Sequence, residues 1–157
     1  MRALIQRVDW AEVRSDERVD EFSAMGQVSR IENGLLVYIG IAASDTIAAA
    51  EWMAEKIANL RIFPDEHGKL NKSVQDVRGD VLTVSNFTLL ANAARGRRPS
   101  FSAAATYQQA EPVYQAFLEA LGKQGVTVQK GLFGARMKIQ SQASGPVNVI
   151  VDSPHQD

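Results

Sequence analysis

The sequence predicts a single α+β domain in which two main helices lie against mostly antiparallel or mixed, barrel-like β-sheets. Two observations carry this prediction. Short apolar runs bounded by turn residues recur along the chain, and several follow one another directly, which is typical of α+β rather than of regularly alternating folds. Only two stretches, 46–60 and 103–121, show helical periodicity. The 157 residues have the length of one domain, residues 1–157, with no internal repeat or linker.

The composition excludes several classes of protein. Hydrophobic residues make up 45% and charged residues 22%, an ordinary globular mixture. The net charge of −1 provides no global basic field, so a nucleic-acid partner would need a local patch. The absence of cysteine excludes disulfides, thiolate catalysis and cysteine-based metal sites. No run approaches the roughly 18 apolar residues of a membrane span, and the first ten residues lack the apolar centre of a signal peptide, so we expect a cytoplasmic protein.

The first elements are expected to be strands. Ala3 to Val8 is a short apolar strand candidate, followed by a charged stretch at 14–26 that we interpret as a loop or an extended hairpin arm. Gln27 to Ile31 and Leu35 to Ile41 are the next two strand candidates. Asn33-Gly34 separates them, and this dipeptide between apolar runs predicts a tight β-hairpin.

A helix is expected next, over Thr46 to Leu60. Ser44 or Asp45 can cap it, and apolar residues recur at helical spacing along its body. Arg61 to Phe63 predicts a brief strand, and 64–68 predicts a turn.

The second half contains one more helix and several strands. Asp80 to Ser85 predicts a strand. A helix is expected over Ala103 to Leu121, capped by Ser102, and Pro112 within it predicts a break or kink near Glu111. Residues 153–157 are expected to form a tail. The remaining strand candidates are Val126 to Gln129, Arg136 to Gln142 and Val147 to Val151.

Familiar catalytic motifs are missing from the sequence. There is no phosphate-binding glycine loop, no H-E-x-x-H pair and no G-x-S-x-G elbow. His67 falls in an exposed turn and His155 in the tail, so a Ser-His-Asp device is not expected. The acidic pairs at 16–17 and 65–66 are interpreted as solvated turns, and no metal or other cofactor is expected.

Four weaker patterns remain. Ser85 and Thr88, in the run SNFTL, can supply hydroxyls, and exposed N–H groups at a strand end can hold an oxyanion; ordinary strand-end polarity is the alternative. The Gly145-Pro146 pair allows a close main-chain approach to a ligand, or simply turns the chain into its last strand. Arg7, near the end of the first strand, either points inward or is a solvated edge charge.

The fourth pattern is a basic loop. Arg95, Arg97 and Arg98 lie within four residues and can neutralise phosphates through bidentate contacts. A solvated loop without a partner is the alternative. The residues by themselves therefore lead to an α+β domain with a phosphate-bearing partner as one possibility.

Seven sequence segments, taken together in their order along the chain, are more informative than any single motif. They are ALIQRV (3–8), NGLLVYIGI (33–41), NLRIFPDEHGKLNKSV (59–74), VLTVSNFTLL (81–90), GRRPSFSAAA (96–105), GLFGARMKIQ (131–140) and SGPVNVIVDS (144–153). Together they resemble the D-aminoacyl-tRNA deacylase family, formerly D-tyrosyl-tRNA deacylase, over nearly the whole chain. The resemblance implies a hydrolase that acts on the ester at the 3′ end of D-aminoacyl-tRNA and glycyl-tRNA in translation quality control, without a cofactor or an obligatory protein partner.

The resemblance also implies a homodimer with shared active sites. In the family, a Gly-cisPro motif, here Gly145-Pro146, enters the partner's site and rejects the L side chain by steric exclusion. Arg7 matches the arginine that holds this motif. In the family the SNFTL run borders the scissile ester, so the expected catalytic residues are Ser85, Asn86, Phe87 and Thr88. Thr88 acts either through its hydroxyl or only through its main chain, and in the second case the tRNA 2′-OH assists hydrolysis.

Further site residues are implied in the same way. Phe133, Gly134 and Met137 fall in the block that shapes the family's pocket for the terminal adenosine. The loop with Arg95, Arg97 and Arg98 is the expected contact for the tRNA backbone.

Two departures from the family pattern leave alternatives open. Asn86 stands in place of the usual glutamine of S-Q-x-T-L, and Asn148 stands in place of the usual threonine of G-P-x-T. The stretch 14–26 is also longer than usual. One alternative is therefore a family-derived protein that binds tRNA or another nucleic acid without turnover. Another is an editing paralogue that acts on small mischarged L-aminoacyl-tRNA.

Overall fold

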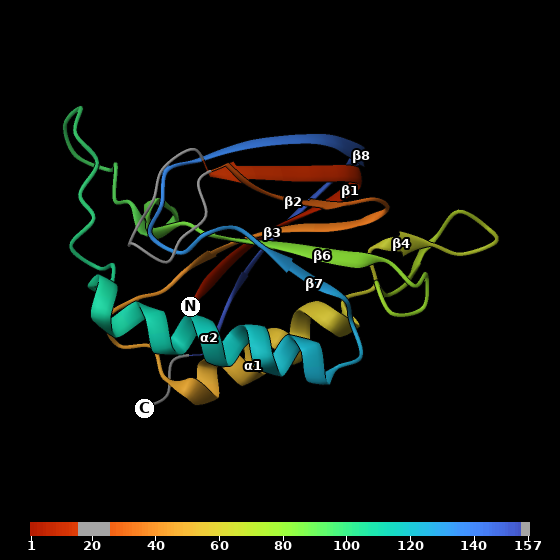
Figure 1. Cartoon of the computed structure of the whole chain (residues 1–157), viewed down its shortest axis with the longest axis horizontal. Coiled ribbons are helices and arrows are strands. Elements are labelled where there is room, and N and C mark those ends of the chain that lie inside the picture. The colour runs from red at the N-terminus through yellow and green to blue at the C-terminus, as the bar shows by residue number, and fades with distance from the viewer. Residues whose placement is uncertain (16–25, 155–157) are drawn as a thin grey trace.

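The computed structural model describes residues 1–15 and 26–154. Its elements form a mixed, barrel-like sheet with α1 and α2 side by side on one face (Figure 1). In chain order they are β1 (Arg2–Ser15), β2 (Gln27–Ile31), β3 (Gly34–Gly40), α1 (Ile47–Asn59), β4 (Phe63–Pro64), β5 (Leu70–Lys72), β6 (Asp80–Ser85), the 3-10 helix η1 (Phe87–Leu90), α2 (Tyr107–Lys123), β7 (Val128–Lys130) and β8 (Met137–Asp152).

Strand β1 organises the sheet. It pairs antiparallel with β2, β3 and β8, while β6 joins β3 and β7 joins β6 in parallel register. The two parallel connections are the ones that contain α1 and α2, as expected where a crossover must carry the chain back along the sheet. The expected α+β class with a mixed sheet is confirmed.

The two faces of the sheet bury separate apolar cores. Ala3 and Ile5 of β1 point toward the helices, where they pack in a core that includes Met53 of α1 and Phe117 of α2. The opposite face has a smaller core that includes Leu82. This alternation follows from the two-residue period of a strand, and burial of both faces explains the long apolar runs of β3 and β6.

The predicted hairpin at Asn33-Gly34 is wrong. Strands β2 and β3 do not pair with each other but follow one another along β1, with Ile31 opposite Ala11 and Gly34 opposite Val8. Gly34 is required for another reason: a Cβ there would lie 1.9 Å from the carbonyl oxygen of Asp80 on β6. The glycine that suggested a turn is therefore needed where two neighbouring strands pack closely.

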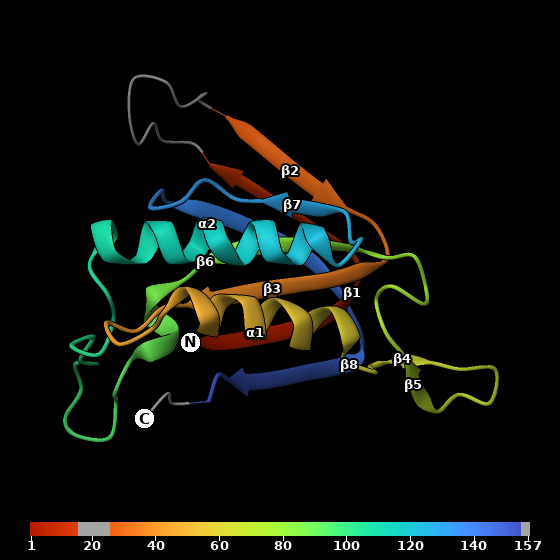
Figure 2. The same ribbon diagram turned by 90° about the horizontal axis from the view of Figure 1, so that it is seen from below.

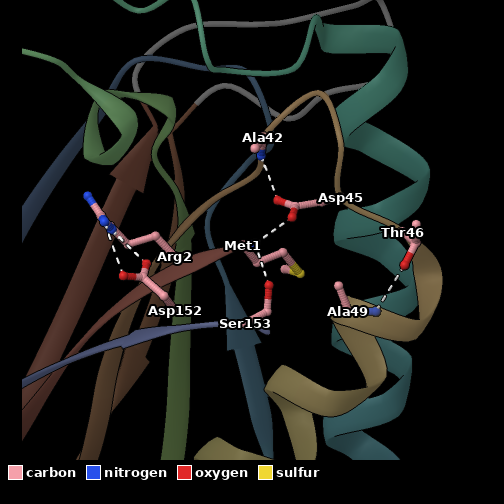
Figure 3. Close-up of polar contacts among 8 residues, drawn as sticks. All are labelled: Met1, Arg2, Ala42, Asp45, Thr46, Ala49, Asp152 and Ser153. Atoms are coloured by element: carbon pink, nitrogen blue, oxygen red, sulfur yellow. Dashed lines mark hydrogen bonds and ion pairs between the residues drawn. The ribbon is translucent and has the colours of Figure 1, made fainter. Parts of the chain in front are cut away.

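The helix α1 agrees with the prediction, but its cap does not. Thr46 is the N-cap, with its hydroxyl accepting from the N–H of Ala49 at 3.3 Å. Asp45 instead accepts from the N–H of Ala42 and pairs with the amino group of Met1 (Figure 3). The loop before α1 is thus tied to the start of β1.

The end of β8 also contacts the start of β1. The hydroxyl of Ser153 accepts from the amino group of Met1 at 2.6 Å, and Arg2 makes a two-pronged contact with Asp152 at 2.7 and 3.1 Å (Figure 3). Ser153, the first residue of the predicted tail, is therefore buried, while residues 155–157 lie outside the described residues.

The helix α2 begins four residues later than predicted. Thr106, not Ser102, is the N-cap, and it forms a reciprocal capping box with Gln109. The predicted break near Glu111 is also wrong, because the helix continues through Pro112 to Lys123. None of the helices in the described ranges is long and apolar enough to cross a membrane.

The C-terminal strands differ from the prediction in their continuity. Residues 137–142 of the first predicted run and all of 147–151 belong to one strand, β8, and Gly145-Pro146 lies inside it rather than at a strand start. Similarly, β1 extends to Ser15, so the predicted arm begins within a strand, and its residues 16–25 lie outside the described residues.

Candidate functional site

A cavity of about 410 Å³ opens beside the C-terminal end of β6. Strand β6 ends at Ser85, and η1 turns away directly afterwards, which leaves the segment between them on the cavity wall. Its lining comes from four parts of the chain far apart in sequence: Ile39, Ile41, Ser85, Asn86, Phe87, Ala105, Tyr107, Ala110, Phe133, Gly134 and Ala135. The structure thus brings together the SNF segment and the Phe133-Gly134 pair.

An aromatic wall closes one side of the cavity. The rings of Tyr107 and Phe133 meet edge to face with centroids 4.9 Å apart, and Phe133 stacks on the buried Tyr114 at 5.3 Å. Gly134 has a φ of +76°, and a Cβ there would lie 2.5 Å from Cε2 of Tyr107. Only glycine lets the chain pass this close to the tyrosine ring, so the wall depends on Gly134.

The turn after β6 contributes Ser85, Asn86 and Phe87 to the cavity wall. The side-chain oxygen of Asn86 caps η1 by accepting from the N–H of Thr88 at 3.1 Å, and it also accepts from the Thr88 hydroxyl. The N–H of Asn86 donates to Ile39 at 2.8 Å. The N–H of Phe87 has no acceptor among the described residues, as is usual for the first residue of a helix. Asn86 therefore orders the turn and leaves the N–H of Phe87, a cavity-lining residue, without an acceptor among the described residues.

The described lining contains no carboxylate, imidazole or amine. Its hydroxyls are those of Ser85 and Tyr107, and the latter lies 3.4 Å from the carboxylate of Glu111. Behind the wall, burial raises the pKa of Tyr114 to about 12, although its hydrogen bond with Thr83, at 3.0 Å, acts in the opposite direction. Stabilisation of charge in this cavity must come from dipoles and N–H groups.

The Gly145-Pro146 pair forms a bulge in β8. Gln6 lies opposite Asn148 and Val8 lies opposite Ala143, so residues 144–147 face Arg7 alone. The guanidinium of Arg7 donates to the carbonyl oxygens of Ser144 at 3.2 Å and Ile62 at 2.8 Å. The Gly145-Pro146 peptide is cis, and Gly145 has a φ of +122°. Arg7 thus points inward and fastens the bulge to the segment before β4.

The bulge and the cavity lie at opposite ends of one subunit. The contact between Arg7 and Ile62 places the bulge near the β4–β5 hairpin, whereas η1 lies at the other end of the sheet (Figure 2). Asn148 is near the bulge, Thr88 is on the solvent side of η1, and Met137 packs against the smaller core; none of the three lines the cavity. The assigned roles of these residues stay predictions.

The basic loop projects from the same end as η1 (Figure 1). Arg95, Arg97 and Arg98 are exposed, and none of them pairs with a carboxylate in the part of the chain that the structure describes. His67 lies at the far hairpin, where its main-chain N–H donates to the carboxylate of Asp65 at 2.8 Å. Within the described ranges, no three His, Asp or Glu side chains lie close enough to hold a metal ion.

Tyr107 is one of the cavity residues that the sequence interpretation missed; the others are Ile39, Ile41, Ala105, Ala110 and Ala135. The misplaced start of α2 put Tyr107 inside a helix, so no position in a wall was expected. The capping box of Thr106 and Gln109 was a readable signal, because it makes Tyr107 the first residue of the helix.

Comparison with solved structures identifies the fold. A structure described as a probable eukaryotic D-amino acid tRNA deacylase superimposes with a TM-score of 0.78 over 96% of this chain and 97% of the other, at 17% identity. A second, described as c-Myc DNA unwinding element binding protein, superimposes with a TM-score of 0.84 over 99% of this chain and 100% of the other, at 39% identity.

Sequence comparison identifies the family. The family model described as D-Tyr-tRNA(Tyr) deacylase matches residues 4–152, so the chain belongs to this family. The proteins named D-aminoacyl-tRNA deacylase from Syntrophomonas wolfei and Roseiflexus castenholzii are 43% and 46% identical to it. Each match covers 98% of this chain, and 97% and 92% of the respective relative.

Proposed function

We propose that this protein hydrolyses the ester bond of D-aminoacyl-tRNA and glycyl-tRNA in the cytoplasm, as a proofreading step of translation. Its relatives carry the name of this activity. The observation that carries the proposal for this chain is the cavity whose lining combines an aromatic wall with Phe87, a residue whose N–H has no acceptor among the described residues. An aromatic wall can stack on a nucleobase, and an N–H group can stabilise a developing oxyanion.

The reaction needs little from the side chains. The terminal adenosine lies against Phe133 and Tyr107, which places the ester carbonyl near the N–H of Phe87. A water molecule, assisted by the tRNA 2′-OH, attacks the carbonyl carbon, and Phe87 donates to the oxyanion. The bond to the ribose oxygen then breaks, that oxygen takes up a proton, and amino acid and free tRNA leave. Positioning and oxyanion stabilisation suit a lining without a general base.

The substrate specificity requires a second copy of the chain. One subunit keeps the Gly145-Pro146 bulge away from its own cavity, so the bulge can restrict only the cavity of a partner. Leu4 of β1 lies between Tyr38 of β3 and Ile150 of β8 on the sheet face away from the helices. Ile150 is 66% exposed. This apolar face is suited to a homodimer contact.

Cavity filling tests the hydrolytic site. Ala110→Phe places a ring in the cavity, whereas Gln108→Phe adds the same ring on the exposed side of α2. We expect the first variant to lose D-tyrosyl-tRNA hydrolysis at least tenfold and the second to keep it. Equal activity of both variants would contradict the proposed site.

Subunit mixing tests the shared architecture. Ala110→Phe damages the cavity and Gly145→Ala damages the bulge, so a heterodimer of the two has one site with both parts intact. Mixed subunits should recover D-selective hydrolysis that neither homodimer shows. Failure to recover it, with heterodimers verified by native mass spectrometry, would contradict a cavity completed by the partner.

A second candidate is nucleic-acid binding without turnover. It is favoured by the exposed arginines of the 92–100 loop and by the 39% identical structure named as a DNA unwinding element binding protein. Under this alternative the wild-type protein binds tRNA or DNA but leaves every ester intact. Ester hydrolysis and filter binding measured on one preparation separate the two functions.

A further inference from the structure

The bulge of β8 has two flanks that must be kept at a fixed separation. The flanking pairs are Gln6 with Asn148 and Val8 with Ala143. Four residues, 144–147, therefore lie opposite one residue of β1. Main-chain pairing is interrupted over these four, so side chains must determine how far the bulge projects.

One side chain, Gln6, connects both flanks. Its Nε2 donates to Oδ1 of Asn148 at 2.9 Å, after the bulge, and its Oε1 accepts from the hydroxyl of Ser141 at 3.2 Å, before the bulge. The next residue, Arg7, donates to Ser144 inside the bulge and to Ile62 beyond it. Two consecutive residues of β1 thus hold the flanks and the bulge.

We propose that Gln6 is a positioning residue for stereochemical selection, acting through Asn148 and Ser141 on the projection of the Gly145-Pro146 bulge. This inference rests on the proposed function. It also gives Asn148 a role without substrate contact: the carboxamide that departs from the family pattern is the acceptor for Gln6.

The network should affect selectivity more than stability. Asn148 and Ser141 are exposed in the single subunit, so water there replaces the lost hydrogen bonds when Gln6 is truncated. Steric rejection is more sensitive, because it depends on where main-chain atoms lie relative to the substrate, and small displacements change the fit.

Gln6→Ala, Asn148→Ala and the double variant test the proposal, with Gln142→Ala as the matched control. Gln142 accepts from the indole N–H of Trp10 at 3.1 Å, so its loss removes a side-chain bond of the same β1–β8 ladder without spanning the bulge. The readouts are the ratio of kcat/KM for D- and L-tyrosyl-tRNA, the Tm, and hydrogen exchange of residues 141–150.

Each single variant should lower the D/L ratio roughly tenfold, the factor that 1.4 kcal/mol represents. The double variant should lower the D/L ratio no further than the more impaired single variant does, because both substitutions remove the same hydrogen bond between Gln6 and Asn148. Gln142→Ala should keep the wild-type ratio. A wild-type ratio in active Gln6→Ala, or an equal fall in Gln142→Ala, would overturn the positioning role.

Hydrogen exchange separates this inference from the proposed function. If the wild-type protein hydrolyses no ester, the proposed function fails, and the exchange data still decide the structural role. Gln6→Ala should accelerate exchange at 143–148 more than Gln142→Ala does. Equal protection in the two variants would overturn the role of Gln6 even in an active enzyme.

Discussion

Gly145→Ala is the substitution that most directly disturbs the bulge. The added Cβ would lie 2.9 Å from Nη2 of Arg7 and 2.9 Å from Cγ2 of Val147. The φ of +122° adds backbone strain, since L side chains rarely adopt this conformation. The guanidinium or the bulge must therefore move, and both are part of one hydrogen-bonded unit.

The size of the effect follows from these contacts. A non-glycine residue in such a conformation costs about 1–3 kcal/mol, which corresponds to a fall in Tm of about 2–4 °C per kcal/mol for a domain of this size. Gly145 is exposed, so the bulge can relieve part of this strain by moving toward solvent. We expect a folded protein with a modest loss of stability and a D/L selectivity ratio that falls at least tenfold.

The assay compares deacylation of D- and L-tyrosyl-tRNA, with Gly68→Ala as the control. Gly68 also has a positive φ, +76°, but no atom lies within 4 Å of an added Cβ, and it lies in the hairpin of β4 and β5. The control should lose about 1 kcal/mol of stability and keep the wild-type ratio. A Gly145→Ala protein with unchanged selectivity would refute the role of the bulge.

Three further predictions concern other parts of the molecule. Gly134→Ala should push Tyr107 into the cavity and lower kcat/KM at least tenfold while L-tyrosyl-tRNA stays rejected; loss of rejection instead would contradict separate roles for the cavity and the bulge. The raised pKa of Tyr114 means that the folded state keeps its proton above pH 10 while the unfolded state loses it. Stability should therefore fall between about pH 10 and 12, by about 1.4 kcal/mol per pKa unit, and chemical denaturation should show a smaller fall in Tyr114→Phe. Replacing the three arginines of the 92–100 loop by glutamine should weaken tRNA binding and flatten its salt dependence; an unchanged salt slope would remove the loop from the interface.

The sequence predicted the elements better than their connections. Both helices and most strands were found, because amphipathic periodicity and apolar runs report burial directly. The predicted hairpin failed because Asn33-Gly34 has two uses, as a tight turn and as a place where two backbones meet, and only the position of Asp80 decides between them. The start of α2 was misplaced because Ser102 and Thr106 are both good caps, and only Thr106 has its glutamine partner at the third helical position.

The site was predictable in its parts but not in its arrangement. The SNF segment and Phe133-Gly134 line one cavity, whereas Thr88 and Met137, which were expected with them, do not, and the roles of all these residues stay predictions. That expectation came from the resemblance, since no local pattern links segments nearly 50 residues apart. Gln6 could not have been found from the sequence, because its partners lie across a bulge whose register exists only in the folded sheet.

The most direct test of the whole account is the ester lifetime on matched D-tyrosyl-, L-tyrosyl- and glycyl-tRNA, with purified wild-type protein and no added metal. The account predicts rapid loss of the D-tyrosyl and glycyl esters, with the L-tyrosyl ester spared. Survival of all three esters would contradict hydrolysis and favour nucleic-acid binding. Loss of the L-tyrosyl ester at the same rate as the D-tyrosyl ester would contradict selection by the bulge.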